Sequence, residues 1–190
     1  LIPRDDTEVV VNLCIDFLEN RTDKKTVDLC SGSGAIAVAL DKISGAKVTA
    51  VEIDETAFSY LETNVKENNS SVKPVMADAL KICDTFADGE LDLIVSNPPY
   101  IKSADIETLQ KEVRLEPRLA LDGGEDGYDF YREIVSRWSR KLKKGGALAF
   151  ELGEGQADAV KALMTDKGFS DFKISLDFGG VQRAIIGTLL

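Results

Sequence analysis

The stretch VDLCSGSG, residues 27–34, decides the fold. Its first half is a short apolar run typical of a buried strand, and the helix-forming residues Ala35–Leu40 follow directly after its second half. Glycines at positions 32 and 34 allow the sharp turn and the close ligand approach that a strand–loop–helix junction requires. The stretch therefore predicts the first strand (Thr26–Cys30) and first sheet-covering helix of an α/β fold, with a ligand loop between them.

Strand-like and helix-like segments alternate through the rest of the chain. We expect further strands at Lys47–Ile53, Val72–Ala77, Leu91–Ser96, Gly146–Leu152, Phe172–Phe178 and Arg183–Leu189, and helices at 6–19, 56–68, 104–113, 128–142 and 156–167. Strands separated by helices imply a mainly parallel sheet with helices on both faces. No helix separates the last two strands, so an antiparallel hairpin is expected at the sheet edge. Without linkers or repeats, residues 1–190 are predicted to form a single domain.

Composition excludes several classes of function. The chain has no histidine, which excludes Ser-His-Asp triads and histidine-ligated zinc. Cys14, Cys30 and Cys83 lack C-x-x-C spacing, so no metal site and no disulfide framework is expected. The net charge of −10 disfavours a surface for phosphate backbones. No apolar run reaches the ~20 residues that span a bilayer, and no secretory signal is recognised, so we expect a cytoplasmic protein.

Carboxylates stand at the ends of the next two strands. Glu52 follows the glycine loop by close to the ~20 residues at which an acid accepts hydrogen bonds from ribose hydroxyls. Asp78, beside Ala79, ends the third strand and can read an adenine amino group. Both a dinucleotide and S-adenosylmethionine fit these features. Asp28 inside the strand end favours S-adenosylmethionine, because it can hold a cationic amino group directly or through water.

The sequence Asn97-Pro98-Pro99-Tyr100 directly follows the fourth strand. The two prolines fix their own φ angles and keep the preceding residues extended, so the Asn97 side chain and the Pro98 carbonyl become rigid acceptors. Two fixed acceptors orient a planar amino group towards an activated methyl group, and Tyr100 packs against its plane. Because the cofactor supplies the reactivity, orientation replaces a histidine base.

These motifs resemble the amino-directed class I methyltransferases, and further phrases resemble the HemK/PrmC family of protein-glutamine N5 methyltransferases. The phrases are LIPRDDTE (1–8), EV (112–113), EP (116–117), ALDGGEDG (120–127), YR (131–132), ELG (151–153) with Gln156, and GVQR (180–183). Two positions depart from the family pattern. Asp5 replaces a common proline, and Ala79 stands where some relatives have a larger residue.

The resemblance implies a Rossmann-like class I methyltransferase that uses S-adenosylmethionine and releases S-adenosylhomocysteine. The acceptor implied is the glutamine of the Gly-Gly-Gln motif in class I peptide chain release factors. The expected cofactor-binding residues are Asp28, Cys30, Ser31, Gly32, Ser33, Gly34, Glu52, Asp78, Ala79 and Asn97. The substrate is expected against Asn97, Pro98, Pro99 and Tyr100, of which Asn97, Pro98 and Tyr100 form the catalytic group. We expect a monomer without the helical N-terminal domain that relatives usually carry.

Two other functions remain open. An adenine-N6 or guanine-N2 methyltransferase acting on DNA or rRNA shares the Asn97–Tyr100 motif. Its best phosphate-binding surface would consist of Arg137, Arg140, Lys141, Lys143 and Lys144. These cations stand at an expected helix end, where they complement the helix dipole, so we predict no nucleic-acid binding. A non-catalytic nucleotide-binding module is disfavoured by the intact Asn97–Tyr100 motif.

Overall fold

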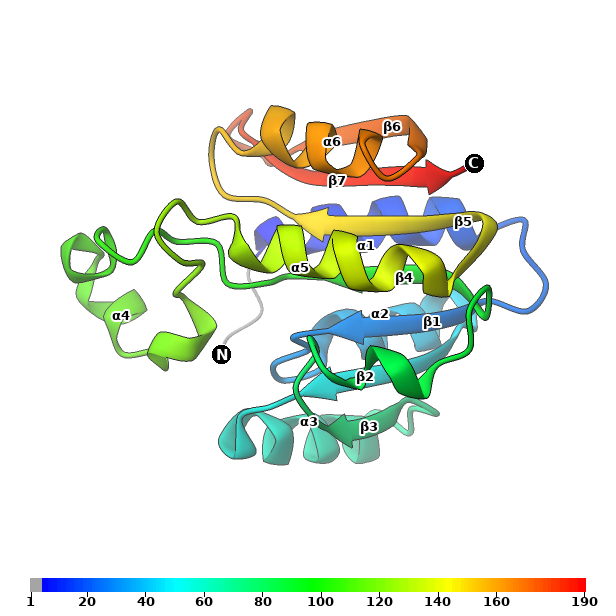
Figure 1. Ribbon diagram of the computed structural model, residues 1–190. Helices are drawn as coiled ribbons and strands as arrows, with labels where there is room; N and C mark the ends of the chain where they lie inside the picture. Colours follow the sequence, from blue (N-terminus) through cyan, green and yellow to red (C-terminus); the bar gives the residue numbers. More distant parts are fainter. Residues whose placement is uncertain (1–4) are drawn as a thin grey trace.

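The computed structural model of the chain describes residues 5–190 (Figure 1). Its strands are β1 (Lys25–Leu29), β2 (Lys47–Glu52), β3 (Lys73–Met76), β4 (Leu91–Ser96), β5 (Leu142–Glu151), β6 (Phe169–Leu176) and β7 (Gln182–Leu189). They form one sheet with the order β3-β2-β1-β4-β5-β7-β6. Strands β1 to β5 pair in parallel, whereas β7 is antiparallel to both β5 and β6. The expected mostly parallel sheet with an antiparallel C-terminal hairpin is confirmed.

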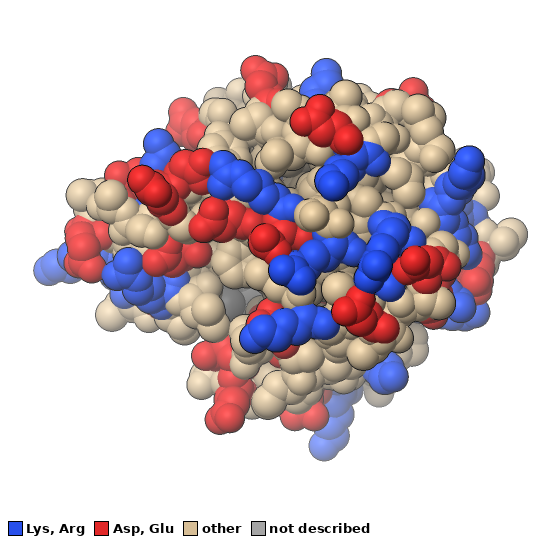
Figure 2. Space-filling view, viewed as in Figure 1, with Lys and Arg blue, Asp and Glu red and all other residues tan. Residues whose placement is uncertain are grey.

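Helices cover both faces of this sheet. They are α1 (Asp5–Leu18), α2 (Ala35–Ser44), α3 (Glu55–Glu67), α4 (Lys111–Arg114), α5 (Asp129–Trp138) and α6 (Ala157–Thr165). Helices α1, α2 and α3 lie on one face, and α5 and α6 lie on the other, over which basic and acidic side chains are interspersed (Figure 2). The helix predicted over 128–142 ends at Trp138. None of the helices in the described range has the length and apolarity needed to cross a membrane. The family phrase at 1–8 lies partly outside the described residues, because Leu1–Arg4 are not among them.

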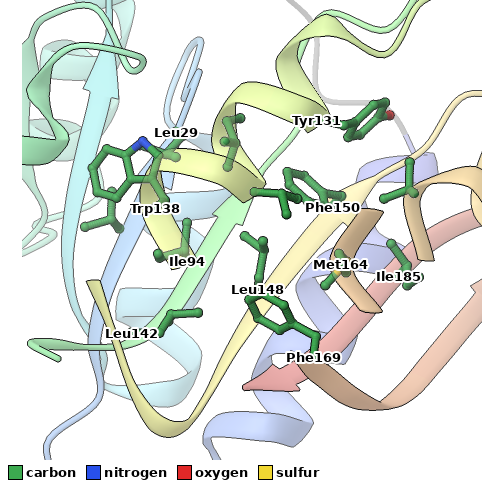
Figure 3. Packing of buried hydrophobic residues seen from close by; sticks show 14 of the residues in the cluster. Leu29, Ile94, Tyr131, Trp138, Leu142, Leu148, Phe150, Met164, Phe169 and Ile185 are labelled. Atoms are coloured by element: carbon green, nitrogen blue, oxygen red, sulfur yellow. The ribbon is translucent and has the colours of Figure 1, made fainter. Parts of the chain in front are cut away.

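Each face of the sheet has its own apolar core, because successive side chains of a strand point to opposite faces. In β5, Leu148 and Phe150 belong to the core under α5 and α6, whereas Ala147 and Ala149 belong to the core under α1, α2 and α3. Figure 3 shows the first of these cores, in which Trp138 is fully buried. Burying a large apolar side chain contributes roughly 1.5–3 kcal/mol. The two cores therefore fix the sheet from which the site loops emerge.

The segment 104–113, which the sequence predicted as one helix, forms two short pieces instead. A 3-10 turn at Ile106–Thr108 and helix α4 are separated by extended backbone at Leu109. The Thr108 hydroxyl donates to the carbonyl three residues before it, and such local bonds compete with helical ones. Most of the described side chains in this segment are exposed, so burial adds little support for a longer helix.

The carboxyl ends of the parallel strands meet along one edge of the sheet, on the left in Figure 1. The chain continues from β1 to β2 on one side and returns to β4 on the other, so β1 and β4 flank a topological switch point. Ligands of open α/β sheets bind at such points. The segment that carries α4 projects from the same edge (Figure 1). The fold thus brings the glycine loop, Glu52 and Asn97 to one place.

Candidate active site

A pocket lies at this edge of the sheet. Its walls come from the loops after β1, β2, β3 and β4 and from the segment 116–121. Of the residues predicted from sequence, those that line it are Cys30, Ser31, Gly32, Ser33, Glu52, Asp78, Ala79, Asn97, Pro98, Pro99 and Tyr100. Asp28 and Gly34 do not belong to the lining of this pocket. The structure therefore brings together most of a residue set that spans 73 positions of sequence, from Asp28 to Tyr100 (100 − 28 + 1).

The glycine loop runs through left-handed backbone conformations. Cys30, Gly32 and Gly34 have φ angles of 57°, 57° and 83°. The φ angle of Gly34 favours glycine, and a Cβ atom there would lie 2.3 Å from Cδ1 of Leu61 in α3, so a larger residue would also have to displace that side chain. Burial, reinforced by the nearby Glu52 carboxylate, raises the pKa of the Cys30 thiol to about 12. Cys30 is therefore a neutral wall residue at ordinary pH.

Asp28 lies behind the loop. Its side chain is fully buried, and its Oδ2 atom accepts a hydrogen bond of 2.6 Å from the Ser31 hydroxyl. Burial raises the pKa of Asp28 to about 7, although the bonds from Ser31 and from the Ala37 amide oppose the shift. Its Oδ1 atom has no hydrogen-bond partner among the described residues. Asp28 thus shapes the loop from inside and leaves one carboxyl oxygen uncompensated.

Glu52 joins the ends of β1 and β2. Its Oε2 atom accepts a bond of 2.7 Å from the Gly32 amide, and its Oε1 atom accepts bonds of 2.8 Å from the amides of Ile53 and Asp54. Asp54 in turn caps α3, since its side chain accepts from the Ala57 amide at 2.8 Å. A carboxylate has about four acceptor positions, so Glu52 retains capacity for a ligand hydroxyl.

The turn after β3 is fixed from two sides. The Asp78 carboxylate accepts from the Leu80 amide at 2.8 Å and pairs with the Lys81 ammonium at 2.9 Å. Partial burial raises its pKa, but these two partners prevail and hold the pKa of Asp78 below its usual value. On the other side, the Trp138 indole donates to the Ala79 carbonyl at 2.9 Å. Asp78 is therefore an ionised acceptor on a rigid turn.

The segment Asn97–Tyr100 forms the wall opposite the acids. The Ser96 hydroxyl, directly before it, donates to the Leu29 carbonyl at 2.7 Å and ties β4 to β1. Pro98 is buried, and Asn97 is half-buried with a carboxamide that makes no hydrogen bond within the described part of the chain. The Tyr100 hydroxyl donates to Glu151 at 3.5 Å. The segment is thus anchored at both ends, and Asn97 lines the pocket between these anchors.

The sequence did not predict the rest of the pocket lining. It includes Thr7, Glu116, Pro117, Leu119, Ala120, Leu121 and Phe130, with Ile101 beside them. Three phrases of the family resemblance, at 1–8, 116–117 and 120–127, contain some of these residues, but nothing in the sequence indicated that they line the pocket. Residues 116–121 contain only a short 3-10 turn, whereas Thr7 belongs to α1 and Phe130 to α5. Only the folded chain shows that these separate residues line one pocket.

Four of the five cations considered as a phosphate-binding surface are paired with carboxylates. Arg137 contacts Glu133 at 2.5 Å, Arg140 contacts Asp84 at 2.6 Å, and Lys141 contacts Asp88 at 2.7 Å. Lys143 contacts Asp92 at 2.8 Å. Such pairing leaves little positive field for a nucleic acid. Among residues 5–190, no cluster of three or more acidic or cysteine side chains could hold a metal ion.

Comparison with known proteins gives the family. The methyltransferase small domain family matches residues 5–116. The release factor glutamine methyltransferase of Thermodesulfovibrio yellowstonii is 35% identical over 190 residues, covering 98% of this chain and 67% of that protein. This chain belongs to the release factor glutamine methyltransferase family. The family member of Geobacter sulfurreducens is 41% identical over 191 residues, which cover all of this chain and 66% of that protein. The chain thus spans about two thirds of the length of these relatives.

Solved structures of similar proteins have the same fold. The protein-(glutamine-N5) methyltransferase (release factor-specific) from Alicyclobacillus acidocaldarius has a TM-score of 0.62 and 28% identity, and the match covers 99% of this chain and 94% of that one. A methyltransferase from Pyrococcus furiosus has a TM-score of 0.69 at 24% identity, covering 94% and 82%. The class I methyltransferase architecture expected from the sequence is confirmed.

Proposed function

We propose that this chain is an enzyme that transfers a methyl group from S-adenosylmethionine to the side-chain N5 atom of the glutamine in the Gly-Gly-Gln motif of class I peptide chain release factors. The observation that carries the proposal is the half-buried Asn97 carboxamide, which shares a pocket with the Glu52 carboxylate. The names of the relatives support the substrate. We place the reaction in the cytoplasm, in preparation for translation termination, with the enzyme acting as a monomer.

The β1–β3 side of the pocket fits S-adenosylmethionine. Glu52 has one of its about four acceptor positions left for a ribose hydroxyl. The ionised Asp78 can accept from an adenine amino group in the pocket that Ala79, Leu80 and Phe130 also line. Asp28, which lies behind the loop, would reach a cationic amino group through Ser31 or a water. When bound, the cofactor would supply a methyl group activated on a sulfonium. The glutamine nitrogen would gain this methyl group and lose one proton to solvent, so that the products are N5-methylglutamine and S-adenosylhomocysteine.

The β4 side supplies orientation. A carboxamide nitrogen is a weak nucleophile because its lone pair is delocalised, so the chain must act through placement. The Asn97 side-chain oxygen and the Pro98 carbonyl can accept the two hydrogens of the glutamine NH₂ group, while the Tyr100 ring packs against the amide plane. Proximity and orientation can lower a barrier by up to roughly 10 kcal/mol in favourable cases. No histidine is needed for this role.

The charge distribution favours a protein substrate over a nucleic acid. Four of the five cations at the end of α5 are paired with carboxylates, and the chain carries a net charge of −10. An enzyme that binds a phosphate backbone needs unpaired lysine and arginine side chains on one face.

Methyl transfer from labelled S-adenosylmethionine tests the proposal. The chain is incubated in parallel with unmodified release factor, with the same factor carrying alanine for the motif glutamine, with stripped rRNA and with unmethylated DNA. We expect label in the unmodified release factor and none in its alanine variant. Label in rRNA or DNA alone would identify a nucleic-acid methyltransferase. Label in none of the four would support a non-catalytic module.

A further inference from the structure

The Gln156 side chain connects four segments behind the Asn97–Tyr100 wall. Its Nε2 atom donates to the Tyr100 carbonyl at 3.0 Å and to the Gly127 carbonyl at 3.3 Å. Its Oε1 atom accepts from the Gly153 amide at 2.9 Å and from the Tyr131 hydroxyl at 3.1 Å. The side chain is only 7% exposed and does not line the pocket. Every polar atom of Gln156 is therefore used for holding other parts of the chain.

Three glycines from two segments, Gly123 and Gly127 in one and Gly153 in the other, pack around Tyr100. A Cβ atom on Gly123 would lie 2.7 Å from the Tyr100 Cα atom, and one on Gly127 would lie 2.6 Å from the Tyr100 carbonyl oxygen. A Cβ atom on Gly153 would lie 2.7 Å from Gln156 Oε1 and 3.0 Å from the Tyr100 ring. Real Cβ atoms essentially never approach closer than 3.0 Å. Glycine is costly in a folded chain, because it loses more conformational entropy than other residues. Three of them around Tyr100 indicate that its position is closely defined.

We propose that Gln156 is a positioning residue for methyl transfer. By holding the Tyr100 carbonyl, it fixes the carboxyl-terminal end of the Asn97–Tyr100 segment. The two prolines between make this segment stiff, so a shift at Tyr100 displaces the acceptors at Asn97 and Pro98. The role in transfer rests on the proposed function, whereas the role in holding the segment rests on the contacts alone.

The Nε2 amino group of Gln156 is the part of the side chain that holds the Tyr100 carbonyl. Two carbonyl oxygens face its Nε2 atom, whereas its Oε1 atom faces an amide and a hydroxyl. Gln156→Glu keeps the size and the Oε1 contacts but places an acceptor against the carbonyls of Tyr100 and Gly127. The substitution therefore replaces a hydrogen bond to the Tyr100 carbonyl by repulsion between two oxygen atoms, while the side-chain volume stays the same.

Steady-state kinetics of Gln156→Glu, beside a matched control, test the role in transfer. The control is Ser139→Ala, which removes another buried hydrogen bond, from the Ser139 hydroxyl to the Val135 carbonyl, at the end of α5 away from the pocket. Since a misplacement of about 1 Å can cost about 100-fold in rate, we expect kcat of Gln156→Glu to fall roughly 10- to 100-fold. The KM for release factor and the Kd for S-adenosylmethionine should stay near the wild-type values, and Ser139→Ala should keep its kcat. A wild-type kcat in Gln156→Glu would overturn the role in transfer. So would a Ser139→Ala variant whose kcat and Tm both fall as much as those of Gln156→Glu.

Amide hydrogen exchange tests the holding role without any substrate. The Ile101 amide donates to the Leu121 carbonyl at 3.0 Å, and the Gly123 amide donates to the Ile101 carbonyl at 2.7 Å, so both report on the segment next to Tyr100. We expect these two amides to exchange faster in Gln156→Glu and at the wild-type rate in Ser139→Ala. Unchanged exchange in Gln156→Glu would overturn the holding role. If the wild-type chain methylates no substrate, the proposed function fails while this measurement still decides whether Gln156 holds the segment.

Discussion

On the β1–β3 side of the pocket, the Glu52 carboxylate accepts hydrogen bonds from three backbone amides, whereas on the β4 side the Asn97 carboxamide makes none within residues 5–190. The β4 side is stabilised by a residue outside the pocket lining, Gln156, whose side chain donates a hydrogen bond to the Tyr100 carbonyl. The carboxylates of Glu52 and Asp78 thus hold their own loops through hydrogen bonds from backbone amides. The Asn97 carboxamide, in contrast, belongs to a loop that is held by hydrogen bonds of other residues.

This difference fits the two tasks of the pocket. A carboxylate that fixes its own loop is held in place before a ligand arrives, so binding requires little ordering. An amide that must orient a substrate keeps its hydrogen-bonding capacity for that substrate, and the support behind it supplies the rigidity. Preorganised groups of this kind need no rearrangement at the moment of reaction. Substitutions should accordingly affect transfer on one side and cofactor affinity on the other.

The largest expected effect comes from Asn97→Ala. Removing the oriented acceptor should lower kcat roughly 10²- to 10³-fold, by analogy with the loss of one preorganised hydrogen-bonding group. The Kd for S-adenosylmethionine, measured by calorimetry, should change little because Glu52 and Asp78 remain. Asn68→Ala, which removes the same group from the exposed end of α3, serves as the control. Wild-type kcat in Asn97→Ala would show that the β4 side does not orient the acceptor.

Glu52→Gln should act on binding. It removes a charged acceptor and turns an NH₂ group towards backbone amides, so we expect the Kd for S-adenosylmethionine to rise roughly 10- to 100-fold. At saturating cofactor, kcat should stay close to that of the wild type. Glu55→Gln changes an exposed acid at the start of α3 and is the matched control. A fall in kcat with unchanged Kd would reverse the assignment of the two sides.

The buried Asp28 predicts a pH-dependent stability. Its pKa is about 7 in the folded chain against an ordinary value of 3.8, so the folded state binds more protons than the unfolded state between these values. The contribution of Asp28 to the free energy of unfolding therefore falls as pH rises from about 4 to about 7. Asp28→Asn removes this titration. The Tm of Asp28→Asn relative to wild type should consequently rise across that range, and a difference that is constant with pH would contradict the burial of an uncompensated carboxyl.

The smallest effect is expected from Arg137→Gln combined with Arg140→Gln. Both cations pair with acids on the surface, and exposed ion pairs contribute little, so kcat/KM for release factor should stay within about 2-fold of wild type. The salt dependence of the reaction is the second readout. A tenfold loss that grows weaker at high salt would instead indicate a substrate bound through these cations.

Much of the pocket follows from the sequence, because motifs at the carboxyl ends of neighbouring parallel strands must meet at one edge. That rule brings Glu52, Asp78 and Asn97 together without knowledge of any loop. The rule does not predict that Asp28 is fully buried behind the loop, since a residue at a strand end can face either the pocket or the core. Nor does it reveal Gln156, whose four partners depend on how distant loops pack. The break at 104–113 was missed because local side-chain bonds overrode a helical pattern of apolar residues.

The most direct measurement is tandem mass spectrometry of release factor after incubation with the wild-type chain and S-adenosylmethionine. The proposed roles of Asn97 and Pro98 predict one added methyl group, on the side-chain nitrogen of the Gly-Gly-Gln glutamine, formed roughly 10²- to 10³-fold more slowly with Asn97→Ala. A methyl group on any other atom of the factor, or one formed at the wild-type rate with Asn97→Ala, would contradict these roles.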